Sequence, residues 1–255
     1  FVLTVLDMIH EIFKDYPQLL PEIRENKKLL AEKADRIIAI SENTKKDLVN
    51  ILNINPEKIE VIYLGNSLEP VNTIKLDFEL PENYLLFVGL RTDYKNFHFM
   101  IENLKEFLKQ NRDVKLICTG SAFTEEERSY FENNGIAESV IHHFADDKTL
   151  AYLYANAIAF IFPSLYEGFG IPVLEAFSCG CPALISNTSS LVEVGGDAVL
   201  YFDPKSDESI KSAVDRIVSD KELGKELKAK GYEQLKKFSW DKTAEQTLAL
   251  YNRLI

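Results

Sequence analysis

Two carboxylates stand on either side of a short glycine-containing loop in the second half of the sequence. Glu167 precedes the loop 168–170 and Glu175 follows it, with seven residues between the two acids. The apolar run before the loop predicts a buried strand, and Pro172 suits the first position of the helix that should follow, because proline has no amide hydrogen to lose there. The free amides of the loop would then surround the positive end of a helix, where phosphate binds well.

A carboxylate next to a phosphate is repelled by it, so the two glutamates need a different partner. Carboxylates accept hydrogen bonds from hydroxyl groups, and a ligand with hydroxyls on both sides of its phosphates would use both acids. One set of hydroxyls would belong to a sugar and the other to a ribose, which indicates a nucleotide-sugar. The alternative is that Glu175 only complements the helix dipole and that Glu167 is a solvated loop residue.

The positive charge that a diphosphate requires is present in another loop. Gly89 ends a predicted strand, and Arg91 and Lys95 follow it in the segment GLRTDYKN. Two such cations often form no more than a solvated surface. Both loops nevertheless leave the carboxyl ends of strands in the same predicted sheet, so we expect them to converge on one anion.

Strands and helices must alternate to bring these loops together, and the sequence has this alternation twice. Short apolar runs such as RIIAI and VKLIC predict buried parallel strands, with helical spacing between them. We therefore expect an α/β protein with two Rossmann-like, doubly wound units. The expected division is a first unit at 1–66, a linker at 67–80, a second unit at 81–238 and a final helix at 239–255. Since Phe1 begins directly in a strand-like run, we expect the first unit to be partial.

The composition argues against several classes of protein. A formal net charge of −11, with acids and bases interspersed, disfavours a nucleic-acid-binding surface. The three cysteines have spacings that fit neither a disulfide framework nor a zinc site, which favours a reducing cytoplasm. No apolar run is long enough to span a bilayer, so any membrane contact is expected to be peripheral. We interpret Asp146 and Asp147 as a helix N-cap, not as metal ligands, because the helical run KTLAYLYAN follows them directly.

The segment YEGFGIPVLEAFSCGCP resembles the signature of glycosyltransferase family four, whose members are retaining enzymes with the GT-B fold. The resemblance extends to VGLRTDYKN, SNTSSLVEVGGDAVLYFDP and the closing FSWDKTAEQTLALY, and it covers nearly the whole chain. It implies that Glu175 holds the ribose, that Glu167 holds a hydroxyl of the donor sugar, and that Arg91 and Lys95 bind the diphosphate. The implied donor site comprises Gly89, Arg91, Lys95, Glu167, Gly168, Phe169, Gly170 and Glu175, of which Arg91, Lys95 and Glu167 would act in catalysis.

The resemblance also implies a reaction. A sugar would pass from a nucleoside-diphosphate-sugar to an acceptor hydroxyl with retention at the anomeric carbon, without a metal ion or other cofactor. The acceptor would be a glycan or a lipid-linked glycan, in the assembly of a bacterial polysaccharide. The final helix would cross back onto the first unit, and we expect its packing face to be Trp240, Ala244, Thr247, Leu248 and Tyr251.

One departure from the family pattern keeps an alternative open. Members often carry a His-Asp pair after the first strand, where this sequence has Leu6 before Asp7, and His10 is in a different register. A non-catalytic module that binds a nucleotide-sugar is therefore an alternative. A dinucleotide-dependent oxidoreductase is disfavoured because the third glycine of the G-x-G-x-x-G pattern is missing. The presence of Arg91, Lys95, Glu167 and Glu175 around the two loops argues against a purely structural adaptor protein.

Overall fold

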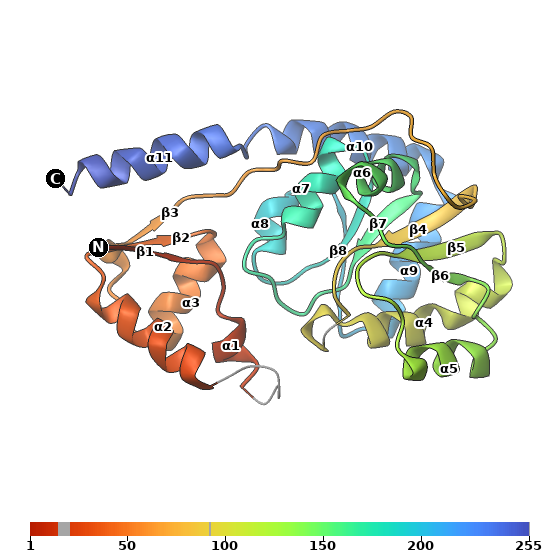
Figure 1. Cartoon of the computed structure of the whole chain (residues 1–255), viewed down its shortest axis with the longest axis horizontal. Helices are drawn as coiled ribbons and strands as arrows, with labels where there is room; N and C mark the ends of the chain where they lie inside the picture. Colours follow the sequence, from red (N-terminus) through yellow and green to blue (C-terminus); the bar gives the residue numbers. More distant parts are fainter. Residues whose placement is uncertain (15–20, 92, 255) are drawn as a thin grey trace.

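The computed structural model describes residues 1–14, 21–91 and 93–254, which form two α/β units with a long connection between them (Figure 1). The first unit holds β1 (Val2–Val5), α1 (Ile9–Ile12), α2 (Pro21–Lys33), β2 (Arg36–Ala39), α3 (Glu42–Leu52) and β3 (Ile59–Val61). Its strands pair in parallel in the order β1-β2-β3. Ser41 accepts a hydrogen bond from the amide of Thr44 and so caps α3, as its sequence predicts.

The second unit contains a larger parallel sheet. Its elements are β4 (Asn83–Phe87), α4 (Phe97–Gln110), β5 (Val114–Cys118), α5 (Glu125–Asn133), β6 (Val140–His142), α6 (Asp147–Asn156), β7 (Ala159–Phe162), α7 (Ile171–Ser178), β8 (Ala183–Ser186), α8 (Leu191–Gly195), β9 (Leu200–Phe202), α9 (Asp207–Ser219) and α10 (Lys221–Leu235). The strand order is β6-β5-β4-β7-β8-β9, with every pair parallel. The expected doubly wound α/β fold is confirmed.

The strand order reverses direction between β4 and β7. From β4 the chain winds outward through β5 to β6, and it then returns to place β7 on the other side of β4. The loops after β4 and β7 therefore diverge to opposite faces of the sheet and leave a crevice between them, which is where open α/β sheets bind ligands. These are the two loops that carry Lys95 and Glu167.

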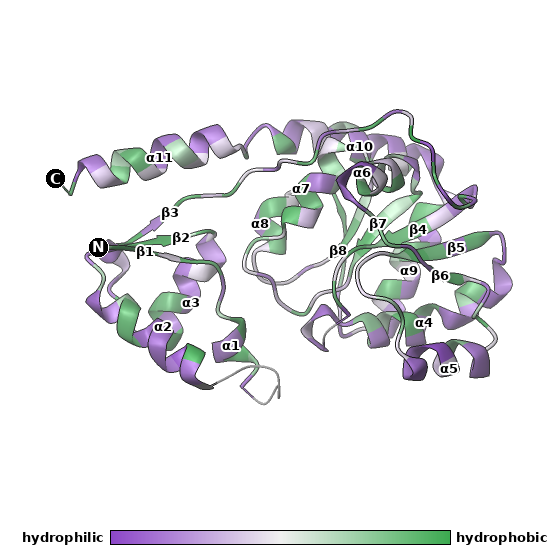
Figure 2. Cartoon of the chain, viewed as in Figure 1, coloured by the Kyte–Doolittle hydropathy of each residue, from purple (hydrophilic) through white to green (hydrophobic). Residues whose placement is uncertain are grey.

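Alternate residues of the second sheet supply two separate hydrophobic cores. Leu86 and Phe160 belong to the core on one face, whereas Leu85, Phe87 and Ile161 belong to the core on the other. Figure 2 shows the strands of this sheet as predominantly hydrophobic, as expected when helices cover both faces. The sheet is thus a rigid platform for the loops at its carboxyl ends.

The connection between the units has no helix or strand over residues 62–82, a stretch that includes the expected linker. It nevertheless packs firmly on the second unit. Leu68 is buried in the second unit's core, and its carbonyl accepts a hydrogen bond from Ser178 at 3.0 Å. The connection is therefore held along α7 and does not swing freely.

Helix α11 (Trp240–Asn252) follows α10 and extends over the first unit (Figure 1). Leu250 is fully buried in a small cluster with Ile38 and Ile62, and Thr243 donates a hydrogen bond to the carbonyl of Tyr63 at 2.6 Å. The packing face that we expected is wrong, because Leu248 is 59% exposed. The contact face instead follows Thr243 and Leu250, seven residues or two turns apart.

Candidate functional site

The loop between β7 and α7 is fixed by two serines that precede α8. The amide of Glu167 donates to the hydroxyl of Ser189 at 2.9 Å. The hydroxyl of Ser190 lies within hydrogen-bonding distance of the carbonyls of Glu167 (2.8 Å) and Phe169 (3.0 Å). These bonds orient the loop carbonyls inward, toward α8, and Glu167 itself is only 8% exposed. These hydrogen bonds preorganise the loop.

Three consecutive amides of this loop lack a protein acceptor. Gly168, Phe169 and Gly170 are all buried, and in the described part of the chain none of their N–H groups donates a hydrogen bond. Gly170 has a φ of +111° and caps α7, so the helix begins at Ile171 and Pro172 is its second residue, one position later than we expected. Buried amides without a partner are costly. Their arrangement at the start of a helix suits an anion.

Lys95 and Glu167 meet across the crevice between β4 and β7. The Nζ of Lys95 lies 2.7 Å from Oε1 of Glu167 and 5.1 Å from the ring centre of Phe162. The two loops are also joined through their backbones, because the amide of Leu165 donates to the carbonyl of Tyr94 at 2.7 Å. The loop after β4 and the loop after β7 thus form one site.

Arg91 comes from the same loop as Lys95 but makes different contacts. Its guanidinium pairs with Glu127 on α5 at 2.6 Å and also donates to the carbonyls of Ser121 and Ala122. Both side chains of the ion pair are 6% exposed. Burial alone would raise the pKa of Glu127, but hydrogen bonds from Arg91 and the Thr124 amide hold it below the ordinary value. Four of the five N–H groups of Arg91 are therefore engaged within the protein.

Gly89 lies two residues beyond the end of β4 and faces open space. Its φ is +117°, and a Cβ built on it would meet no atom within 4 Å. Backbone in this conformation is accessible to glycine and strained for other residues. A ligand can approach the chain closely here.

Glu175 lies on α7, one turn beyond its start. It is half-buried, and the hydroxyl of Tyr154 approaches its Oε2 at 3.3 Å. Burial raises the pKa of Glu175. A half-buried carboxylate with one weak neutral donor retains capacity to accept further hydrogen bonds.

The first unit contacts the site through the turn after β1. A Cβ added to Gly168 would lie 1.9 Å from the carbonyl oxygen of Leu6 and 2.8 Å from the Cβ of Asp7. Only glycine permits this approach. The position at which the sequence departs from the family pattern therefore lies directly against the loop that carries Glu167.

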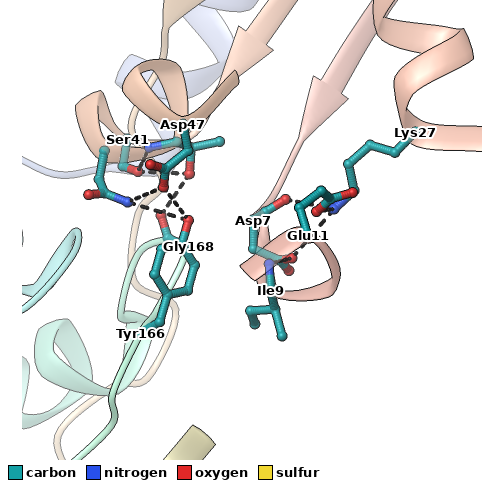
Figure 3. A network of polar contacts seen from close by, with 10 residues as sticks. Asp7, Ile9, Glu11, Lys27, Ser41, Asp47, Tyr166 and Gly168 are labelled. Carbon is teal, nitrogen blue, oxygen red and sulfur yellow. Dashed lines mark hydrogen bonds and ion pairs between the residues drawn. The ribbon is translucent and has the colours of Figure 1, made fainter. Parts of the chain in front are cut away.

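The neighbouring polar side chains stabilise this turn. Asp7 accepts a hydrogen bond from the amide of Ile9 at 3.0 Å, and Lys27 bonds both the carbonyl of Asp7 and the carboxylate of Glu11 (Figure 3). The Nδ1 atom of His10 is buried and has no hydrogen-bond partner in the described part of the chain.

Sequence reasoning missed a polar cluster between the units. The hydroxyl of Tyr166 donates to Asp47 on α3 at 2.8 Å, and Thr44 donates to the carbonyl of Gly168 at 3.3 Å (Figure 3). The side chain of Ser41 caps α3 at its start. No sequence signal places that helix against the Glu167 loop.

Asp146 accepts a hydrogen bond from the amide of Thr149 at 2.8 Å and caps α6, which confirms the N-cap interpretation. Within residues 1–14, 21–91 and 93–254, no three His, Cys, Asp or Glu side chains gather as a metal-binding group. The metal-free reaction stays a prediction. None of the described helices is long and apolar enough to cross a membrane.

Residues 71–234 match the family described as glycosyl transferases group 1. The O-antigen chain mannosyltransferase B of Escherichia coli is 30% identical over 247 residues, which cover 91% of this chain and 65% of that protein. The chain thus spans about two thirds of this relative, and only 31% of the serotype-specific mannosyltransferase WbdA of the same organism.

Solved structures share the fold over almost the entire chain. The sucrose-phosphate synthase of Thermosynechococcus elongatus aligns with a TM-score of 0.82 at 23% identity, over 99% of this chain and 67% of that one. Anabaena Alr3699/HepE, solved in complex with UDP and glucose, aligns with a TM-score of 0.80 at 17% identity, over 98% of this chain and 71% of that one. These neighbours confirm the GT-B type of architecture.

Proposed function

Because the chain belongs to the glycosyl transferases of group 1, we propose that it binds a nucleoside-diphosphate-sugar in the crevice between β4 and β7 and transfers the sugar with retention. The observation that carries the proposal is the run of amides at Gly168, Phe169 and Gly170, which have no acceptor among the described residues, beside the ammonium group of Lys95. A diphosphate would satisfy these buried donors and the cation together. The chemistry of the loop, and not the fold alone, supports a nucleotide-sugar as the ligand.

Each end of the ligand has a carboxylate to receive it. We assign the ribose hydroxyls to Glu175 and a hydroxyl of the donor sugar to Glu167. Lys95 is the principal cation for the diphosphate. Among the described residues, four of the five N–H groups of Arg91 have acceptors, and we propose that it acts mainly by holding the backbone after β5 and only secondarily on phosphate.

In the reaction, the acceptor oxygen forms a bond to the anomeric carbon while the bond from that carbon to the diphosphate oxygen breaks. The acceptor proton passes to the leaving diphosphate, on the same face of the sugar. Lys95 and the loop amides stabilise the negative charge that grows on the diphosphate, so their effect increases toward the transition state. We propose that none of these steps needs a metal ion.

The acceptor is expected to enter from the first unit. The turn at Leu6 and Asp7 approaches the sugar-binding loop, so we place the acceptor hydroxyl on the side of the first unit. Relatives named as O-antigen chain mannosyltransferases support a glycan or lipid-linked glycan acceptor in bacterial polysaccharide assembly. Three buried free thiols suit the reducing cytoplasm.

Thermal denaturation with and without ligand tests the proposal. UDP, UDP-glucose, GDP and GDP-mannose would each be added in excess chelator, because a ligand at 100 times its Kd stabilises a protein by ~2.7 kcal/mol. We expect one diphosphate and its sugar to raise the melting temperature. Failure of all four, or a strict need for added Mg²⁺, would contradict the proposed site.

A non-catalytic donor-binding module is the second candidate, favoured by Leu6 at the position of the family histidine. The two functions differ in turnover. An enzyme releases the nucleoside diphosphate when donor and a glycan acceptor are both present, whereas a binding module leaves the donor intact. Chromatography of the nucleotide after incubation distinguishes them.

A further inference from the structure

The side chain of Tyr166 projects from the loop after β7 of the second unit and packs into the core of the first unit. It is 6% exposed, and its neighbours in that core include Met8, Ile9 and Leu48. The ring of Phe13 meets it edge-on at a centroid distance of 6.4 Å. The residue next in sequence to Glu167 is therefore anchored in a different unit from the sheet that carries the loop.

The hydroxyl of the buried tyrosine is hydrogen-bonded to a carboxylate. Its hydroxyl donates to Oδ2 of Asp47 at 2.8 Å, and the side-chain amide of Asn43 donates to the same oxygen at 2.8 Å (Figure 3). Burial raises the pKa of Tyr166, so the hydroxyl keeps its proton and remains a donor at neutral pH. A charge-assisted bond of this kind is among the stronger hydrogen bonds in proteins.

Helix α3 holds the loop on both sides of Glu167. Asp47 binds the residue before it, and Thr44 binds the carbonyl of Gly168, the residue after it. A second-unit carboxylate completes the contact, because Glu193 accepts hydrogen bonds from the amides of Glu42 and Asn43 at the start of the same helix. The first unit thereby fixes the backbone at Glu167 from two points.

We propose that Tyr166 and Asp47 form a positioning pair, through which the first unit sets the placement of Glu167 toward the donor sugar. The inference rests on the proposed function, because it needs Glu167 to face the sugar. Neither residue touches the ligand. The pair acts only on the sugar end, since the ribose site at Glu175 lies beyond the loop on α7.

The test compares Tyr166→Phe and Asp47→Ala with a matched control, Tyr84→Phe. Tyr84 is also buried, and its hydroxyl donates to the carbonyl of Leu153 at 2.7 Å, within the second unit. Calorimetry would give, for each protein, the ratio of the affinity for UDP-glucose to that for UDP, and likewise for GDP-mannose and GDP. This ratio isolates the sugar end, and a general loss of stability would leave it unchanged.

We expect the ratio to fall about 5- to 10-fold in both variants, as for one lost hydrogen bond, and to stay at the parent value in Tyr84→Phe. The double variant should lose no more than either single variant, because both remove the same bond. Hydrogen exchange gives a readout without ligand, in which the hydrogen-bonded amides of Leu165 and Glu167, on either side of Tyr166, exchange faster in Tyr166→Phe.

Two negative results have different meanings. A parent protein that binds UDP or GDP and its sugar, with variants that keep the parent's ratio, would overturn the positioning pair alone. A parent protein that binds none of the four nucleotides would overturn the proposed function, and the pair with it.

Discussion

The ammonium group of Lys95 lies 2.7 Å from the carboxylate of Glu167, so the cation proposed for phosphate and the acid proposed for sugar form an ion pair. Lys95→Ala should weaken the binding of a nucleoside diphosphate by about 1.5–3 kcal/mol, as for a lost charge-assisted hydrogen bond, and leave the nucleoside unaffected. Calorimetry with both ligands measures the difference. Lys109→Ala is the control, because Lys109 makes a similar 2.7 Å ion pair with Glu106 on the surface of α4.

Arg91→Ala should mainly destabilise the fold. Removal of one partner from a buried ion pair typically costs about 3–5 kcal/mol, because the other charge is left without compensation. Arg128→Ala breaks an exposed pair with Glu125 and should cost no more than ~1 kcal/mol. Urea denaturation of the two variants measures the contrast. An Arg91→Ala protein with parental stability, and a loss of diphosphate affinity equal to that of Lys95→Ala, would instead make Arg91 a direct ligand.

Glu175→Gln should change stability and affinity in opposite directions. Burial raises the pKa of Glu175 in the folded protein above its ordinary value of 4.5, so the folded state binds more protons between those two values. The stability of the parent therefore falls, relative to Glu175→Gln, as the pH rises through this window. At neutral pH the variant should melt at a higher temperature but bind the nucleoside more weakly. A variant that melts lower and binds equally well would reduce Glu175 to a residue that steadies its helix.

Gly65 marks the point where the connection passes beneath the start of α11. A Cβ at Gly65 would lie 2.3 Å from the backbone nitrogen of Trp240. Gly65→Ala should therefore displace α11, and the fluorescence of Trp240, the sole tryptophan, should shift to the red. Gly224→Ala is the control, since its Cβ would meet only Pro182 at 3.8 Å, and alanine in a helix is favoured by ~0.5–1 kcal/mol. Unchanged emission from Gly65→Ala would argue that the crossing is looser than the structure indicates.

The parallel strands of the second unit and the meeting of the two loops could be predicted from the sequence. Buried parallel strands are recognisable as local apolar runs, and loops that leave the carboxyl ends of such strands lie at one edge of the sheet. Side-chain contacts between segments that are distant in the sequence could not be predicted. Arg91 and Lys95 are two cations four residues apart, and nothing in the sequence distinguishes their roles. Arg91 pairs with Glu127 because α5 lies next to it in the fold. The packing face of α11 was wrong for the same reason, since it is set by where the helix meets β2 and the linker. In the sequence Tyr166 is an ordinary loop residue, and its burial in the core of the first unit is evident only from the fold.

The three amides at Gly168, Phe169 and Gly170 form the proposed phosphate site, and backbone amide NMR of the 15N-labelled chain observes them directly. Addition of the diphosphate that stabilises the protein should move these three resonances more than any others, together with those near Lys95. The matching nucleoside should leave all three in place. If the nucleoside shifts them as strongly as the diphosphate, or if the diphosphate shifts only residues remote from the loop, the phosphate site proposed here is contradicted.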